Sequence, residues 1–291
     1  MTKYTQVKVV FVVLRSNKLK IHPTAKIADD VVIECDVFEL GAHSYIGPGC
    51  KITCKEFRAG DYLWMPANVD VGRGGCTGPN SIVQIGNSVG IFEGCVINPS
   101  ESVTIGSNVG IGAECLIWTH GAWLDPLQGF PFTFDDVSIG DNVWLPARSI
   151  MLPGTSIGSN CVIGTGSIIT KDIPDGSLAM GSPCKVIKEN VYPIERTQEE
   201  KDDILRKIVS KWSNVLVPHK GYEPVPVFVE DGKIFVEAAI LNTNTYTVEG
   251  EDSPLSEDLR DYLRRHGIRI YNGKSFKSLK ATYETSFITT S

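Results

Sequence analysis

One histidine in this sequence is a candidate for acid–base chemistry. His120 lies in a segment that reads WTHGAW, between stretches of regular aliphatic spacing. A neutral imidazole can take the proton of a poor nucleophile such as a hydroxyl group, because histidine titrates near physiological pH. A histidine in a loop is more often a packing or solvated residue, so the role of His120 depends on its surroundings.

Two other features invite a chemical interpretation but do not predict a site. The glycine-rich segment 72–78 (GRGGCTG) lacks the Lys-Ser/Thr pair of a phosphate-binding loop, and no strand and helix frame it. The chain has eight cysteines but no CxxC pair, and the closest two, Cys50 and Cys54, differ in repeat position. We therefore expect a flexible loop and compact buried thiols, with no bound metal and no disulfide.

Composition restricts the class of protein. The 291 residues are 42% hydrophobic and 21% charged, with a formal net charge of −6. This charge gives no reason to expect nucleic acid or an anionic membrane as a partner. The longest apolar run, Val9–Leu14, is too short to span a bilayer, and the start lacks the basic segment and cleavage site of a leader. These features predict a cytoplasmic protein without membrane insertion.

A six-residue repeat is the main structural signal. Between residues 139 and 169, aliphatic side chains recur every six residues, at Ile139, Leu145, Met151, Ile157, Ile163 and Ile169. The residue four positions after each is small or β-branched, and Cys50, Cys95, Cys115 and Cys161 occupy this position across the chain. A period of six fits neither a helix nor a single strand. It predicts a parallel β-helix of three faces and about eighteen residues per coil.

The same register extends back to Ile21 and predicts about seven coils. The triplets are Ile21, Ile27 and Ile33; Leu40, Ile46 and Ile52; Phe57, Leu63 and Val69; Ile85, Ile91 and Ile97; Ile105, Ile111 and Ile117; and the two triplets above. Every departure from the period falls at one corner of the prism. Two long insertions, about 70–81 and 118–138, should therefore project from one edge, where loops on a rigid scaffold carry function.

The remaining segments predict a cap and a second domain. Residues 1–20 read as a strand or cap over the first coil, residues 21–192 as the β-helix domain, and residues 193–291 as a small α+β domain. A capping box at 197–200 opens a helix, Asp231-Gly232 suits a hairpin, Ser253-Pro254 opens a second helix, and 268–276 suggests another hairpin. The last domain has no catalytic motif, and oligomer support or acceptor recognition is a hypothesis for it.

From His120 to Lys188 the chain resembles the hexapeptide-repeat acetyltransferases, most closely their galactoside, maltose and xenobiotic O-acetyltransferase branch. The matching motifs read WTHGAW, IGDNVWLP, LPGTSIGSNCVIGTGSIITKDIP and GSPCKVIK. The resemblance implies a left-handed β-helix, acetyl-CoA as co-substrate, direct transfer with His120 as general base, and a homotrimer with active sites between subunits. The implied acceptor is a small-molecule carbohydrate.

The resemblance also assigns binding residues. It implies that Trp144 lies near the thioester and pantetheine arm of acetyl-CoA, that Thr165 and Thr170 line the coenzyme channel, and that Lys171, Lys185 and Lys188 lie near its phosphates. Glu93, Asn98 and Asp125 are candidates for acceptor binding, although the Asn and Asp that the family keeps there do not align cleanly with this sequence. The structural alternatives are packing for Trp144, strand positions for the threonines, solvated surface lysines, and an exposed loop residue for Asp125.

The function that these features predict is transfer of an acetyl group from acetyl-CoA to a carbohydrate hydroxyl, for instance on a surface-polysaccharide precursor. Three alternatives remain open: N-acetylation of an amino sugar, acetylation of an antibiotic, and an inactive β-helix that serves as a binding scaffold. The identity of the acceptor does not follow from the sequence.

Overall fold

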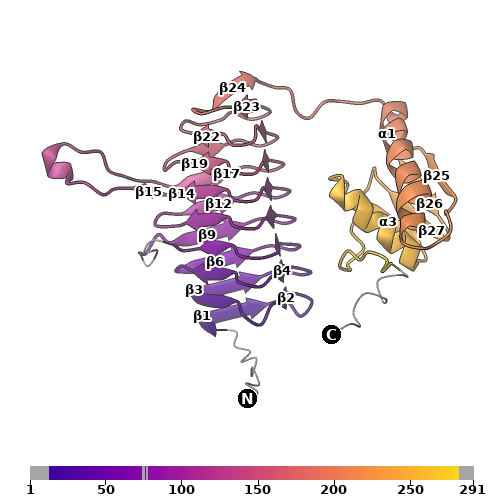
Figure 1. Cartoon of the computed structure of the whole chain (residues 1–291), viewed down its shortest axis with the longest axis horizontal. Helices are drawn as coiled ribbons and strands as arrows, with labels where there is room; N and C mark the ends of the chain where they lie inside the picture. Colours follow the sequence, from indigo (N-terminus) through magenta and orange to yellow (C-terminus); the bar gives the residue numbers. More distant parts are fainter. Residues whose placement is uncertain (1–12, 74–75, 77, 282–291) are drawn as a thin grey trace, which may run out of the picture. The chain divides into compact units, whose positions relative to one another are not determined.

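The structure, a computed structural model, describes residues 13–73, 76 and 78–281. The start of the predicted N-terminal cap and three residues of the glycine-rich segment lie outside this part of the chain. Two compact units are present, one ending at Ile194 and the other beginning at Glu195 (Figure 1).

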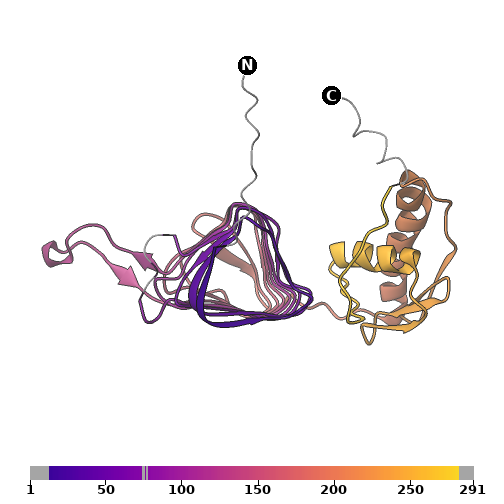
Figure 2. The ribbon, with the colours of Figure 1, turned by 90° about the horizontal axis from the view of Figure 1, so that it is seen from below.

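The first unit is a column of parallel strands with three faces, seen end-on as a triangle in Figure 2. The first face contains β1 (Val13–Ile21), β3 (Val32–Leu40), β6 (Glu56–Ala59), β9 (Ile82–Ile85), β12 (Val103–Ile105), β17 (Val137–Ile139) and β20 (Ser156–Ile157). The third face contains β5 (Lys51–Thr53), β8 (Asp70–Val71), β11 (Val96–Asn98), β14 (Leu116–Trp118), β19 (Ile150–Met151) and β22 (Ile168–Ile169). These two faces form one sheet, because the long strand β3 pairs with both β5 and β6.

The second face is a separate nine-stranded sheet. Its strands, in order, are β2 (Lys26–Ile27), β4 (Tyr45–Ile46), β7 (Trp64–Met65), β10 (Gly90–Ile91), β13 (Gly110–Ile111), β18 (Trp144–Leu145), β21 (Val162–Ile163), β23 (Leu178–Met180) and β24 (Lys185–Lys188). β24 runs antiparallel to β23 and ends the column.

The inward side chains follow the six-residue register of the sequence. Ile91 pairs with Ile111, and Ile111 pairs with Leu145, so that equivalent aliphatic residues stack from one coil of the column to the next. All three are fully buried. Each coil is called a rung from here on. Strands this short are stable because stacking joins their inward side chains into one continuous core. A single rung could not bury these side chains alone. The prediction of a mainly β protein built on a parallel β-helix is confirmed.

The cysteines pack as the repeat predicts. All eight are buried free thiols. Cys50, Cys95, Cys115 and Cys161 are each at most 1% exposed and belong to the hydrophobic core of the column. They act there as small apolar side chains.

The predicted register of the third coil is wrong by two residues. Ala59 pairs with Leu40 and Ile85, Met65 with Ile46, and Val71 with Ile52 and Ile97. These positions had been assigned to Phe57, Leu63 and Val69. The latter three also point inward, because each face buries a second side chain two residues before the first. Phe57 stacks on Phe38 of the rung before it, with ring centroids 5.5 Å apart.

The two ends of the column are longer than predicted. Strand β1 pairs in parallel with β3 along its whole length, so residues 13–20 form a rung of the column. At the other end, Ile173 bridges to Ile157 and Ala179 pairs with Ile163. The register therefore continues for one more coil after Ile169. The repeat is not evident there from the sequence, because Ala179 occupies a position that larger aliphatic residues hold in the other coils.

Both long insertions leave the column at the same corner, as predicted. They follow β8 and β14, which β11 joins within one sheet. The second insertion forms a projecting arm, residues 119–136, visible in Figures 1 and 2. The arm consists of β15 (His120–Gly121) and β16 (Thr133–Phe134), paired antiparallel, and the short 3-10 helix η1 (Pro126–Gln128) at its tip.

The second unit is a small α+β fold, as predicted. It contains α1 (Gln198–Lys211), a π-helical turn η2 (Trp212–Leu216), α2 (Val217–His219), the antiparallel strands β25 (Val227–Glu230), β26 (Lys233–Val236), β27 (Ala239–Asn242) and β28 (Thr247–Gly250), and α3 (Pro254–Arg265). Thr197 and Glu200 form the predicted capping box. Asp231 and Gly232 both have positive φ, which a type I′ hairpin turn requires.

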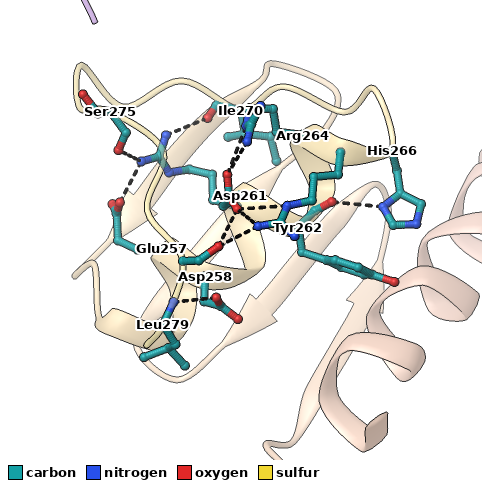
Figure 3. Close-up of polar contacts among 12 residues, drawn as sticks. Glu257, Asp258, Asp261, Tyr262, Arg264, His266, Ile270, Ser275 and Leu279 are labelled. Carbon is teal, nitrogen blue, oxygen red and sulfur yellow. Dashed lines mark hydrogen bonds and ion pairs between the residues drawn. The ribbon is translucent and has the colours of Figure 1, made fainter. Parts of the chain in front are cut away.

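The hairpin predicted for residues 268–276 is wrong, because this segment contains no strand. Its polar groups bind side chains of α3 and of the residues just before it: Arg260 donates to the carbonyl oxygens of Ile270 and Ser275 (Figure 3). Asn272 donates to Asp252 and Glu257. These contacts hold the segment in place without a strand ladder.

Two buried carboxylates of α3 hold the end of this unit together. Asp258 accepts hydrogen bonds from the Trp212 indole at 2.8 Å and from the Leu279 backbone at 2.7 Å. Asp261 accepts from Ser278 at 2.6 Å and forms ion pairs with Arg264 and Arg265 (Figure 3). Burial alone raises the pKa of Asp261, but these hydrogen bonds and charges outweigh it and hold the pKa below its usual value.

Within the described residues, the longest and most apolar helices still fall short of what a bilayer crossing requires.

Candidate active site

His120 lies at the base of the projecting arm, directly after the corner of the column. Its place at the start of β15 follows from the pairing of His120 with Phe134 in the antiparallel arm. The imidazole stacks on the Phe134 ring, with centroids 5.6 Å apart and an angle of 19° between the planes. The Trp118 ring also contacts the imidazole, in an edge-to-face arrangement with centroids 5.8 Å apart. Two aromatic rings thus fix the plane of the imidazole while leaving it partly exposed.

The Nδ1 atom of His120 faces a buried amide. Asn98, at the end of β11, is 0% exposed, and its Oδ1 lies 2.8 Å from His120 Nδ1. The Ser100 hydroxyl donates to the same Oδ1 at 3.0 Å and lies 3.1 Å from Nδ1. Successive rungs create this cluster, because Asn98 pairs with Trp118, two residues before the histidine.

The orientation of the Asn98 amide determines which nitrogen of His120 carries the proton. The Asn98 Nδ2 group donates to the backbone carbonyl of Arg73, which can only accept. The amide oxygen must therefore point at His120, and Nδ1 must be the donor. The neutral imidazole then has its proton on Nδ1 and a free lone pair on Nε2. This is the tautomer that a general base needs when Nε2 faces the substrate.

The base of the arm is anchored to the rung below it. Thr119 is fully buried, and its hydroxyl donates to the Asn98 carbonyl at 2.8 Å. The Thr119 hydroxyl also accepts a hydrogen bond from the Glu101 backbone N–H at 2.9 Å. The backbone carbonyl of Thr119 accepts one from the Asp135 backbone N–H at 3.0 Å. An ion pair of 3.0 Å between Arg73 and Asp70 restrains the loop whose carbonyl orients Asn98.

Trp144 lies on a different face of the column from His120. It belongs to β18 in the nine-stranded sheet, whereas His120 follows β14 of the other sheet. The indole is 45% exposed and lies over Gly110 of the preceding rung. A Cβ atom at Gly110 would come within 2.6 Å and 2.8 Å of two atoms of the indole. The missing side chain of Gly110 therefore creates the space that the Trp144 ring occupies.

The predicted coenzyme residues lie toward the end of the column. Thr165 is exposed in the turn between β21 and β22, and Thr170 and Lys171 are exposed directly after β22. Lys185 and Lys188 are the exposed ends of β24. None of the three lysines forms an ion pair with any residue that the structure describes. Exposed and without acidic partners, they are suited to bind phosphate groups.

The three candidate acceptor residues do not form one cluster. Glu93 is exposed in the turn between β10 and β11, at a different corner from His120. Asp125 caps the 3-10 helix at the tip of the arm, where it accepts from the Leu127 backbone at 2.9 Å. Asn98 does contact His120, but as a buried partner of the imidazole.

Sequence reasoning did not identify Ser100, Thr119 and the Arg73 carbonyl as parts of this site. The signal available for the first two was the register, which places both beside Asn98 at the corner from which the arm departs. The role of the Arg73 carbonyl depends on the path of a loop backbone, which no side-chain pattern reveals. Among the described residues, no group of three or more His, Cys, Asp or Glu side chains could hold a metal ion.

Comparisons with known protein families match part of the column. Residues 136–171 match the family model described as bacterial transferase hexapeptide (six repeats). A galactoside O-acetyltransferase of Escherichia coli (strain K12) is 49% identical over 63 residues, which cover 22% of this chain and 29% of the relative. A Staphylococcus aureus (strain MRSA252) protein named as an acetyltransferase is 47% identical over 66 residues, or 22% of this chain and 33% of the relative. The chain spans about a third of the length of these relatives.

Two solved acetyltransferase structures align with part of this chain. The polySia-specific acetyltransferase NeuO shares 21% identity over 69% of this chain and 93% of its own, with a TM-score of 0.44. A galactoside acetyltransferase in complex with coenzyme A shares 26% identity over 51% of this chain and 70% of its own, with a TM-score of 0.32.

Proposed function

We propose, from the confirmed resemblance of this chain to hexapeptide-repeat acetyltransferases, that it transfers an acetyl group from acetyl-CoA to a hydroxyl group of a carbohydrate. The observation that carries the proposal is the contact between Asn98 Oδ1 and His120 Nδ1, which leaves Nε2 free to accept a proton. We also propose that the reaction takes place in the cytoplasm.

In the proposed reaction, His120 moves a single proton twice. Nε2 takes the proton of the acceptor hydroxyl while the hydroxyl oxygen attacks the thioester carbonyl, so that a C–O bond forms. The imidazolium that results is stabilised by Asn98 Oδ1 through Nδ1–H. As the C–S bond breaks, Nε2 returns the proton to the departing sulfur. The products are the acetyl ester and the free thiol, with no acyl-enzyme.

The proposed coenzyme site uses the residues toward the end of the column. Lys171, Lys185 and Lys188 would bind phosphate oxygens, which fits their exposure and their lack of acidic partners in the described structure. The half-exposed Trp144 indole would pack against the pantetheine arm, and Thr165 and Thr170 would line the path between them.

We propose that two subunits of a homotrimer build each site. The support is that His120 and Trp144 belong to different sheets of one column, so that one chain does not bring them together. The arm also presents apolar side chains that solvent does not favour: Trp123 and Leu127 are each 95% exposed, and Phe132 is 61% exposed. Docking of the arm on a neighbouring subunit would bury them.

Binding of coenzyme A tests the donor site. We expect micromolar affinity by calorimetric titration, and a loss of about tenfold or more in a Lys185→Ala, Lys188→Ala double variant, because two charged hydrogen bonds are removed. A Lys207→Ala, Lys211→Ala variant is the control, since it removes the same charge from exposed positions in the second unit. Absence of binding, or equal losses in the two variants, would contradict the proposed site.

Replacing His120 with Ala tests the base. Turnover should fall at least about 10²-fold, while coenzyme affinity and the circular dichroism spectrum stay unchanged. The same assay, run with hydroxyl sugars, amino sugars and antibiotics as acceptors, separates O-acetylation from the two other transferase reactions. Full activity of the variant would remove His120 from the mechanism, and coenzyme binding without any turnover would favour an inactive scaffold.

A further inference from the structure

Two cysteines at one corner of the column contact each other directly. The Sγ atoms of Cys35 and Cys54 are 3.8 Å apart, although the residues are 19 positions apart in sequence. They lie on successive rungs, one residue after the paired Glu34 and Thr53. Neighbouring strands are about 4.8 Å apart, which lies within the range of Cα separations that a disulfide bridges. A disulfide therefore requires movement of the side chains and little of the backbone.

This thiol pair is reachable from solvent. Cys35 and Cys54 line a surface pocket of about 590 Å³ together with Cys76, Arg15 and Lys55. They retain 6% and 4% of their surface exposed. The pocket is therefore the side from which a small reagent would approach the two thiols.

The two thiols differ in their readiness to ionise. The hydrogen bond from the Cys54 thiol lowers the pKa of Cys35, and this effect exceeds the opposing effect of burial. The same hydrogen bond, with burial, raises the pKa of Cys54. Cys35 is therefore the nucleophile of the pair, because the thiolate is the reactive form of cysteine.

A second pair supplies an internal comparison. Cys95 and Cys115 also interact, since a hydrogen bond from Cys95 lowers the pKa of Cys115. However, these two residues are 1% and 0% exposed and do not line the pocket beside Cys35. This pair therefore differs from Cys35 and Cys54 in its access to the pocket.

We infer that Cys35 and Cys54 form a redox-active dithiol site that reacts with small organic disulfides, independently of the proposed acetyl transfer. The Cys35 thiolate attacks one sulfur of a disulfide such as oxidised glutathione and releases one glutathione thiolate. Cys54, after losing its proton, then attacks the Cys35 sulfur and releases the second glutathione. Two protein thiols are oxidised to one disulfide, and one glutathione disulfide is reduced to two thiols.

Thiol counting on the native, full-length protein tests the site. The reduced protein is incubated with excess oxidised glutathione, then denatured and blocked with N-ethylmaleimide for intact-mass and peptide analysis. We expect the count of blocked thiols to fall from eight to six, with Cys35 and Cys54 recovered as one linked peptide. An unchanged count, or a link that joins Cys95 to Cys115 or Cys54 to Cys76, would overturn the inference.

Single variants test the order of attack. Cys54→Ser should stop at the first step and carry one glutathione on Cys35. Cys35→Ser should carry less glutathione on Cys54 than Cys54→Ser carries on Cys35, because burial still raises the pKa of Cys54 after its contact with the Cys35 thiol is lost. Cys95→Ser is the matched control and should still form the Cys35–Cys54 disulfide. Equal modification of Cys54 in the Cys35→Ser variant would contradict the assigned order, and the wild-type peptide map does not depend on the folding of any variant.

Discussion

The partner of His120 is an amide, and this choice has a chemical consequence. Asn98 Oδ1 fixes the imidazole tautomer through a 2.8 Å contact without adding a negative charge. A carboxylate in the same place would fix the same tautomer but would also stabilise the imidazolium, the form that cannot act as a base. We propose that Asn98 is a positioning residue, in place of the acceptor contact predicted for it.

The Asn98→Asp variant tests this role through its pH dependence. A carboxylate beside Nδ1 favours the protonated imidazole, so a higher pH is needed to produce the neutral base. We expect the acidic limb of the kcat/KM profile to move upward by about one pH unit or more, with little change in coenzyme affinity. The measurement is the rate at saturating acetyl-CoA across neutral pH.

Asn98→Ala serves as the companion variant, because it removes orientation without adding charge. It should lower kcat at every pH and leave the position of the acidic limb unchanged. If both variants keep the wild-type profile and rate, Asn98 does not orient the base.

At the scale of elements, the rungs place each functional group by their stacking order. Trp144 can lie flat along its face because Gly110, on the rung before it, has no side chain. Gly90, one rung further, has a looser contact, since a Cβ there would meet the edge of the Phe92 ring at 3.2 Å. The local space over the face is thus set by residue size on neighbouring strands.

Gly110→Ala tests whether the Trp144 ring must lie where it does. The added methyl group would displace the indole, and we expect acetyl-CoA affinity to fall by up to about tenfold. Gly90→Ala, on the same face, should change affinity little. Titration of both variants, with tryptophan fluorescence to follow the indole, distinguishes the outcomes; equal affinities would show that the ring position is unimportant for binding.

The helix α3 makes the second unit sensitive to acid. Because the pKa of Asp261 is depressed in the folded state, its carboxylate contributes stability above the unfolded pKa of about 3.9. This contribution is lost as the pH falls through the folded pKa. Asp261→Asn should therefore cost about 2 kcal/mol at neutral pH and much less in acid.

Urea unfolding of the full chain at several pH values, followed by helix dichroism, measures this difference. Asp203→Asn provides the control, because its ion pair with Arg206 is half-exposed and should contribute well under about 1 kcal/mol. Equal destabilisation of the two variants at neutral pH would contradict the role assigned to Asp261.

The accuracy of the sequence prediction varied with the kind of pattern. The six-residue period predicted most of the inward stack because one aliphatic side chain per face dominates it. It misplaced the coil around Phe57 because that residue is also buried, two positions earlier, on top of Phe38. For the site, the motif predicts His120 as the base, and this role stays a prediction. Its contact with Asn98 and the backbone of Arg73 depends on how two insertions fold at one corner, and a one-dimensional repeat does not specify this.

For the whole molecule, the separation of His120 from Trp144 is the feature with the largest consequence. If a site needs both residues, neighbouring subunits must supply them. The exposed apolar arm and the exposed indole are then two halves of one interface, which the isolated chain leaves open to solvent.

Mixed oligomers test this arrangement. A chain carrying His120→Ala and a chain carrying Trp144→Ala should each be nearly inactive alone. When both are refolded together, about a quarter of the sites in random trimers would pair an intact His120 with an intact Trp144. We expect recovery of activity on that order. Absence of recovery in oligomers shown by mass to be mixed would place the site within one chain.

The confinement of both long insertions to a single corner has an evolutionary consequence. At the two other corners, consecutive strands are joined by short turns without added residues. A change in the length of the arm would therefore leave the hydrogen bonds between strands and the core unaltered. Residues 121–133 can therefore diverge, lengthen or be exchanged between relatives while the stacked framework persists. The arm is therefore a position at which protein engineers could graft a new loop without rebuilding the fold.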